Sequence, residues 1–364
     1  MPDRDPNTTR NKLIGPLIAI ASTFLCIGIL ELTGFIWESR TAQGQNGWTL
    51  VGARRLQLER HGGETNPYYK FKPDETYNWE DIPVYINSKG FRGAEFTSEK
   101  PGGVYRILNL GDSVAFGWEV NEDETYGEIL EYALNQHSYE VIYEVINLGV
   151  PTLNLEAERN LFIQEAKSYH PDLVILEITV VNDIYGSGPN ISEERSIFSW
   201  LRDRTYFWPF LTNNIRFLLA KQFGPEAFPV LNPPQEASAY FSLDEDDEVY
   251  RRVWGYALDI SDAAREMGAD TIIVVFPTAF QINSSQHPDI PQKAFKHEAE
   301  LAGLDLIDLL PVYGSVCEEA GRDECEGYEN LLFADVWMHP NPLGHKLAAD
   351  ELFKLIVENN QSTK

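Results

Sequence analysis

Residues 105–113 read Tyr105-Arg106-Ile107-Leu108-Asn109-Leu110-Gly111-Asp112-Ser113 and predict a buried β-strand that ends in a tight turn. The apolar run has the length of a strand, and Gly111 permits a sharp change of direction after it. In an open α/β sheet, ligands bind beyond the carboxyl ends of the strands. A serine at this point therefore presents its hydroxyl in a crevice.

A second group of polar residues lies near the other end of the chain, from Asp335 to His345. Gly-Asp-Ser alone is a common surface turn, and so it carries little weight by itself. His339 supplies the base that a nucleophilic serine needs, and Asp335 supplies the carboxylate that orients this base. An early serine and a late Asp/His pair together predict a hydrolytic triad.

The pattern from residue 104 onward alternates between strands and helices. Apolar runs predict five strands, at residues 105–110, 141–147, 173–179, 271–276 and 304–307. Helical periodicity predicts helices at residues 124–136 and 291–301, one capped by Asn154 and one after Pro342. A further helix is expected to start at residues 244–248, with a capping box formed by Ser242 and Glu245. This alternation indicates an α/β protein, a flavodoxin-like three-layer αβα sandwich with a mostly parallel five-stranded sheet.

The first forty residues differ from the rest. Residues 13–30 carry no charge over a length that fits a transmembrane helix, and Glu31 alone interrupts a further apolar segment to residue 37. Basic residues precede it at Arg4, Arg10 and Lys12, which favours a cytoplasmic N-terminus at residues 1–12 and an exported remainder. The alternative is a cleaved signal peptide, but no small-residue cleavage site directly follows the apolar core, so we favour a signal anchor at 13–37.

The remaining chain divides into a stem and a domain. Residues 38–103 mix aromatic and turn residues and predict extended structure packed on the domain at 104–360, because a free linker would be poorer in aromatics. Residues 184–243 interrupt the strand–helix alternation with an aromatic, helical insertion. It is interpreted as a lid over the site, as a helical excursion with its own small core, or as a membrane-surface contact.

The composition of the chain argues against a role in nucleic-acid binding. The chain has 364 residues and a formal net charge of −27, which disfavours nucleic acid as a partner. Three cysteines are present, of which Cys317 and Cys325 bracket a short acidic loop. Either a local disulfide or two free thiols fits this spacing, which lacks the further ligands of a zinc site. No metal ligand set and no cofactor motif is predicted.

The candidate site residues all follow predicted strands or lie in the last loop before the final helix. Ser113, Gly149 and Asn182 follow strands one, two and three, and Asp335 and His339 follow strand five. Since these loops gather at one edge of a doubly wound sheet, the residues can converge. Ser113 would attack, His339 would take its proton, and Asp335 would orient the imidazole. The N–H groups of Ser113 and Gly149 and the Asn182 amide would hold the oxyanion, with Gly149 letting an ester carbonyl approach the backbone.

Four blocks in this order resemble those of the SGNH hydrolase family, also called the GDSL lipase/esterase family. They are Gly111-Asp112-Ser113, Asn147-Leu148-Gly149, Asn182-Asp183 and Asp335 to His339 with its trailing residues to His345. The segment 86–93 is also similar to one in membrane-tethered bacterial members. Two positions depart from the family pattern: Val180 stands where a glycine is usual, and three residues instead of two separate Asp335 from His339. His345, the competing histidine, is interpreted as structural.

The resemblance implies a membrane-anchored, extracytoplasmic serine ester hydrolase that works through an acyl-serine intermediate without metal or cofactor. The substrate would be a small-molecule, carbohydrate or lipid ester. One alternative keeps the site but passes the acyl group to an exported polysaccharide, as an O-acyltransferase. A second alternative is a catalytically silent binding or assembly protein that retains the fold.

Overall fold

The computed structural model describes most of the chain from residue 58 onward. The described residues are 22–36 without 24 and 35, 58–79, 82–138, 141–180, 183–184, 205, 207, 243–283, 289–321, 325, 331–335 and 338–362. Asn182, nearly all of the 184–243 insertion and the first part of the expected anchor lie outside this set. Within the part of the chain that the structure describes, no helix combines the length and hydropathy that a membrane crossing requires.

A five-stranded sheet forms the centre of the molecule. Its strands are β5 Val104–Leu110, β6 Ile142–Asn147, β7 Leu173–Thr179, β8 Asp270–Phe276 and β9 Asp305–Asp308. They lie in the order β6-β5-β7-β8-β9, and every neighbouring pair is parallel. Counted along the chain this is the order 2-1-3-4-5 of a doubly wound sheet. The predicted α/β class is confirmed, and the five expected strands begin and end within a residue of their observed bounds.

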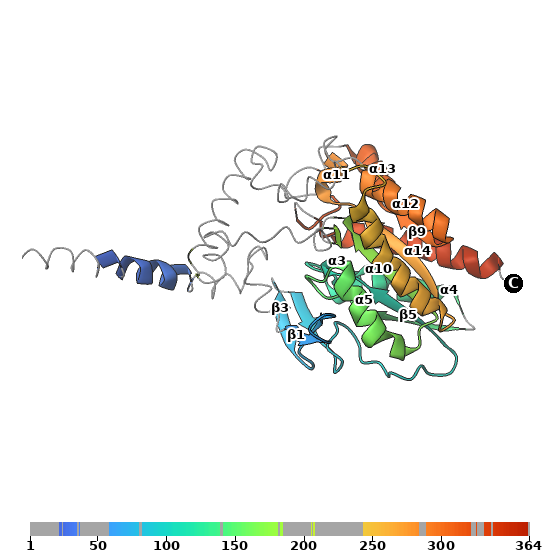
Figure 1. The fold of residues 1–364 in the computed structure, drawn as a ribbon, viewed down its shortest axis with the longest axis horizontal. Helices are drawn as coiled ribbons and strands as arrows, with labels where there is room; N and C mark the ends of the chain where they lie inside the picture. Colours follow the sequence, from blue (N-terminus) through green and yellow to red (C-terminus); the bar gives the residue numbers. More distant parts are fainter. Residues whose placement is uncertain are drawn as a thin grey trace, which may run out of the picture.

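Helices cover both faces of the sheet (Figure 1). One face packs against α5 Leu155–Gln164, α10 Glu248–Arg265 and α12 Ile290–Ala302, and the other against α4 Tyr126–His137, α13 Leu310–Ala320 and α14 Pro342–Ser362. All seven residues of β7 are buried, and alternate side chains enter the two cores. Short elements complete the domain: α3 Ser113–Phe116, η1 Glu122–Glu124, η2 Ala166–Tyr169 and α11 Ala279–Asn283.

Polar side chains fix where the helices begin. The expected cap at Asn154 is present, and its side chain accepts the Ala157 N–H at 3.0 Å. The next long helix, α10, begins at Glu248, the last residue of the expected range 244–248. Its cap is Asp247, which accepts the Val249 N–H at 2.8 Å, and not the expected capping box of Ser242 and Glu245. In a run of acidic residues, the carboxylate that adjoins the first amphipathic turn reaches its free amides, whereas Glu245 lies too far upstream.

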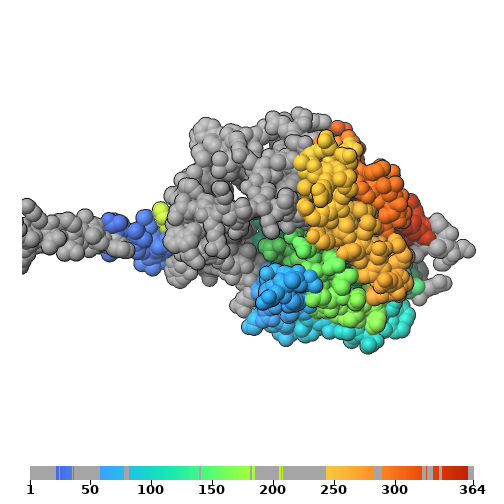
Figure 2. Space-filling view, in the orientation of Figure 1, coloured from blue at the N-terminus to red at the C-terminus, as the bar shows by residue number. Residues whose placement is uncertain are grey.

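Two β-hairpins precede the central sheet. β1 Leu58–His61 pairs with β2 Tyr68–Phe71, and β3 Thr76–Trp79 pairs with β4 Ile82–Tyr85, both antiparallel. Lys70 forms a 2.7 Å ion pair with Glu165 after α5, and Gln164 donates to the Asn66 carbonyl. Figure 2 shows the hairpin surface in blue lying against the green surface of α5. The first hairpin therefore packs on α5.

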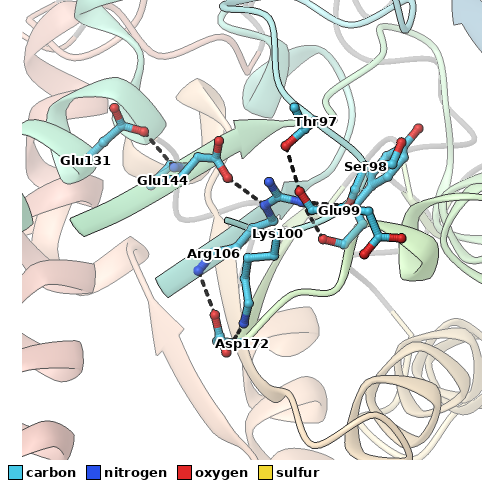
Figure 3. A network of polar contacts seen from close by, with 10 residues as sticks. Thr97, Ser98, Glu99, Lys100, Arg106, Glu131, Glu144 and Asp172 are labelled. Atoms are coloured by element: carbon cyan, nitrogen blue, oxygen red, sulfur yellow. Dashed lines mark hydrogen bonds and ion pairs between the residues drawn. The ribbon is translucent and has the colours of Figure 1, made fainter. Parts of the chain in front are cut away.

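A polar network holds the start of β5 (Figure 3). The fully buried Arg106 donates from Nε to Glu144 on β6 at 2.6 Å and from Nη1 to the Tyr169 carbonyl at 2.6 Å. Asp172 accepts the Arg106 amide N–H at 2.8 Å and pairs with Lys100 at 2.5 Å. The backbone N–H, Nε and Nη1 of this buried arginine therefore all meet acceptors at the end of β5 opposite to Ser113.

A disulfide joins Cys317 at the end of α13 to Cys325, with the two Cα atoms 5.9 Å apart. Of the two alternatives that the sequence left open, the structure has the disulfide. Both cysteines are buried.

Candidate active site

Ser113 is the first residue of α3, the single helical turn that follows β5. Asp112 caps this turn, because its Oδ1 accepts the Val114 N–H at 2.7 Å. A Cβ on Gly111 would lie 2.5 Å from Glu177 Oε2 and 2.7 Å from the Ala115 side chain, so only glycine fits between β5 and the turn. The serine hydroxyl is thereby held at the carboxyl end of the sheet, and the residue is 6% exposed.

The structure brings Ser113, His339 and Asp335 into one hydrogen-bonded chain. His339 Nε2 lies 2.9 Å from Ser113 Oγ, and His339 Nδ1 lies 2.5 Å from Asp335 Oδ2. The other carboxylate oxygen, Oδ1, accepts the N–H groups of Met338 at 2.9 Å and His339 at 3.2 Å. The carboxylate thus binds both the imidazole and the backbone of the histidine that it orients, with three residues between them in the chain.

The electrostatics of His339 favour proton uptake. Burial alone would lower its pKa, but Asp335, with smaller contributions from Glu119 and Asp112, raises the pKa above the ordinary value of 6.5. Trp118, two residues after α3, stacks on the imidazole with ring centroids 5.7 Å apart and planes 28° apart. The sequence reasoning missed Trp118, and its position just beyond the Gly-Asp-Ser turn is the signal that could have found it.

Gly149 lies beside α3, but for a different reason from the one expected. A Cβ at this position would meet the Phe116 backbone nitrogen at 2.2 Å, so only glycine permits this close approach of α3. Its N–H, expected as an oxyanion donor, donates to Asn147 Oδ1 at 2.8 Å. The glycine lets the loop after β6 support the turn that carries Ser113. Asn182 lies outside the described residues.

His345 is completely buried. Its Nδ1 accepts the Tyr126 N–H at 3.3 Å, and its ring stacks on the Tyr126 ring with centroids 5.8 Å apart. Burial lowers its pKa to about 3, so the imidazole stays neutral near pH 7. This environment agrees with the structural role expected for His345.

A group of buried carboxyl groups lies beneath the serine. Oxygens of Asp112, Glu177 and Asp183 lie within 4.8 Å of one another, and Glu158 on α5 interacts with all three. All four side chains are completely buried. Oxygen donors of this kind can surround a divalent cation such as Ca²⁺. The sequence signal for this group is Glu177, an acidic residue between the apolar residues of β7.

Hydrogen bonds and bound protons stabilise these carboxyl groups in their buried positions. Glu177 accepts the Asp112 N–H at 3.1 Å and the Thr179 hydroxyl at 2.6 Å, and Asp183 accepts the Thr179 N–H at 2.8 Å. Burial, reinforced by the neighbouring carboxylates, holds the pKa values of Glu158, Glu177 and Asp183 well above their ordinary range. Like charges this close cannot all remain ionised, and so the cluster takes up protons readily.

A family model and several solved structures are similar to this chain. The model of the GDSL-like Lipase/Acylhydrolase family matches residues 110–347. Among solved structures, the acetyl xylan esterase AlAXEase is 14% identical with a TM-score of 0.43, covering 69% of this chain and 99% of that chain. The psychrotrophic esterase EstA from Pseudoalteromonas sp. is 12% identical with a TM-score of 0.41, covering 70% and 98%. The lipase/acylhydrolase from Enterococcus faecalis is 14% identical with a TM-score of 0.39, covering 69% and 95%. No curated protein matches.

The matched range takes in more than half of the chain and every expected site residue, from Ser113 to His339. The predicted resemblance is confirmed by a match that begins in β5 and ends in α14. The chain therefore belongs to the GDSL-like lipase/acylhydrolase family, and it is an ester-bond hydrolase.

Proposed function

We propose that this hydrolase cleaves esters through a covalent acyl-Ser113 intermediate. The observation that carries the proposal is the chain from Ser113 Oγ to His339 Nε2 at 2.9 Å and from His339 Nδ1 to Asp335 Oδ2 at 2.5 Å. Nucleophile, base and orienting carboxylate stand in the order that acyl transfer requires.

Each residue has one task in the reaction. As Ser113 Oγ bonds to the ester carbonyl carbon, its proton passes to His339 Nε2. His339 then gives that proton to the alkoxide as the bond to the alcohol breaks. Water repeats the cycle: His339 takes its proton, hydroxide adds to the acyl carbon, and Ser113 leaves with a proton. Asp335 keeps a proton on Nδ1 and stabilises the imidazolium between these steps.

The oxyanion needs donors that are in place before it forms. We assign this role to the Ser113 N–H and to the side-chain amide of Asn182. Asn182 follows β7, whose carboxyl end adjoins that of β5 in the sheet. Gly149 is assigned the task of supporting α3, on the strength of its contact with Phe116.

The proposed substrate class is an ester with an accessible carbonyl: an acetylated carbohydrate, a small carboxylic ester or a lysolipid. The test offers aryl esters of increasing acyl length to the wild type and to Ser113→Ala, together with a fluorophosphonate probe. Acid release and labelling by the wild type alone support the proposal. Acyl transfer to an added sugar in place of water would make the chain an O-acyltransferase, and a folded chain that neither labels nor hydrolyses would contradict both activities.

We also infer that the enzyme works outside the cytoplasm on a membrane anchor at residues 13–37. The uncharged run at 13–30, with Arg10 and Lys12 before it, supports this placement. The disulfide between Cys317 and Cys325 agrees with it, because disulfides persist in oxidising compartments. Retention of the intact chain in membranes after salt and carbonate washes is expected. A soluble product that begins near residue 40 would instead establish signal-peptide cleavage.

A further inference from the structure

We propose that Arg92, from the segment before the family-matched domain, is a positioning residue for the nucleophile and the base. This proposal rests on the proposed function of Ser113 and His339. Arg92 lies between β4 and β5, outside the matched residues 110–347. Its side chain nevertheless ends at the turn that carries Ser113, and the residue is only 2% exposed.

The guanidinium group binds the backbone just after α3. Nη1 donates to the carbonyls of Phe116 at 3.1 Å and Gly117 at 2.6 Å, and Nη2 donates to the carbonyl of Val120 at 2.9 Å. Its Cζ also lies over the Phe116 ring, 5.2 Å from the centroid. A planar fork of donors is the group that can satisfy three differently directed carbonyls at once. Burial lowers the pKa of Arg92 to about 10, which leaves it charged near pH 7.

The bound turn touches both reacting residues. The Trp118 N–H donates to the Ser113 carbonyl at 3.0 Å, and the Trp118 ring stacks on His339. Residues 116–120 are thus connected to the nucleophile through the backbone and to the base through an aromatic face. A group that fixes this turn fixes the relative placement of Ser113 Oγ and His339 Nε2.

The loop that presents Arg92 is itself rigidly built. Asn87 Oδ1 accepts the N–H groups of Lys89 at 3.0 Å and Phe91 at 3.1 Å, and Asn87 Nδ2 donates to the Ala94 carbonyl at 3.1 Å. Phe71 of β2 is fully buried and stacks on Phe116 with centroids 5.2 Å apart. The hairpin segment therefore supplies a preformed support for α3, not only a connection to the N-terminus.

The loss of this support should act on the rate more than on substrate binding. A displacement of about 1 Å between reacting groups can cost roughly 10²-fold in rate. We therefore expect Arg92→Ala to lower kcat about 10²-fold while KM changes little, since Arg92 is placed behind the turn and away from Ser113 Oγ. Arg92→Lys should fall between this variant and the wild type, because one ammonium cannot satisfy all three carbonyls.

Arg106 offers a matched control. It is also a fully buried arginine before the matched domain, and it also donates to backbone carbonyls, those of Ser98 at 3.0 Å and Tyr169 at 2.6 Å. It lies near the start of β5, whereas Ser113 follows the end of this strand. Arg106→Lys should cost stability but leave kcat at the wild-type value.

The experiment compares these three variants with the wild type in the full-length chain. It measures kcat and KM for an aryl acetate, the rate of labelling by a fluorophosphonate, and hydrogen exchange of the amides in residues 113–120. Arg92→Lys should slow turnover and labelling and speed exchange in this peptide. Millimolar guanidinium should restore part of kcat in Arg92→Ala, a rescue that a purely global loss of stability would not show.

The outcomes separate this proposal from the proposed function. Folded Arg92→Lys with wild-type kcat, labelling and exchange would overturn it, as would an equal loss of kcat in Arg106→Lys. If the wild type neither hydrolyses nor labels, the proposed function fails, but the exchange of residues 113–120 still decides whether Arg92 holds this turn. If Arg92→Ala does not fold, the comparison of the two lysine variants decides.

Discussion

Trp118 lies face to face with His339, with ring centroids 5.7 Å apart and planes 28° apart. The indole covers one face of the imidazole, while Asp335 and Ser113 bind its two nitrogens in the ring plane. An imidazole constrained in this way keeps the orientation that proton transfer needs. The same indole excludes water from that face and so strengthens the attraction between Asp335 and the imidazolium.

We predict that Trp118→Ala lowers kcat by about 10-fold through loss of this orientation, with a smaller effect on KM. Trp118→Phe keeps an aromatic face at the same position and should retain most of the activity. Steady-state kinetics on an aryl ester measure both variants. Equal activity of the alanine variant and the wild type would show that Asp335 and the loop alone orient His339.

Asp335→Asn should leave the fold intact and lower kcat by up to about 10⁴-fold, because the amide disfavours the productive imidazole tautomer. The pH profile offers a second measurement. Asp335 raises the pKa of His339, and the base acts only when deprotonated. The acidic limb of kcat/KM should therefore lie above pH 6.5 in the wild type and shift to lower pH in Asp335→Ala. An unchanged acidic limb would mean that another group titrates there.

The two histidines of the last block should respond differently to substitution. His339→Ala should approach the defect of Ser113→Ala, because it removes the base. His345→Ala should retain kcat but lower stability, because it removes the acceptor of the Tyr126 N–H and a buried stacking partner. Thermal unfolding and kinetics together distinguish these effects. An inactive but stably folded His345→Ala beside an active His339→Ala would reverse the assignment.

The buried carboxyl cluster predicts a pH-dependent stability. Glu158 has a folded-state pKa well above 4.5, so above that pH the folded chain keeps a proton that the unfolded chain releases. Stability should then fall as pH rises, by about 1.4 kcal/mol per pH unit for one such group, until the folded-state pKa is reached. Glu158→Gln cannot titrate, so its free energy of unfolding should improve relative to the wild type between pH 5 and pH 8.

Urea denaturation at pH 5 and at pH 8 measures the difference in the free energy of unfolding between Glu158→Gln and the wild type. Glu300→Gln is the matched control, because it makes the same change on the exposed surface of α12. It should show no such trend. If Glu158→Gln and the wild type differ by the same amount at both pH values, Glu158 is not the group that holds the proton.

The sheet was predictable because its strands are apolar runs of strand length, each followed by a turn and an amphipathic helix. The positions of Ser113, Asp335 and His339 followed from the rule that ligands bind at the carboxyl ends of such strands. The contact between them is a product of the folded loop, in which the other oxygen of Asp335 binds the Met338 and His339 amides. The role of Asn182 stays a prediction.

Other features depend on contacts between segments far apart in the chain, which leave little periodic signal. Arg92 binds carbonyls 24 to 28 residues away. Glu158 and Asp183 meet only when α5 packs on the sheet, and the reason for Gly149 is the backbone of Phe116. The cap of α10 was predicted wrongly because several adjacent acidic residues can cap a helix, and in the structure Asp247 does so.

The most direct test of the account is labelling of the full-length chain with a fluorophosphonate, followed by peptide mapping. The hydrogen bond from Ser113 Oγ to His339 Nε2 predicts one modified residue, Ser113, and no label on Ser113→Ala or on protein unfolded beforehand. Labelling should also rise with pH as His339 loses its proton. Label at another serine, or ester hydrolysis by Ser113→Ala at the wild-type rate, would contradict the proposed acyl-Ser113 mechanism.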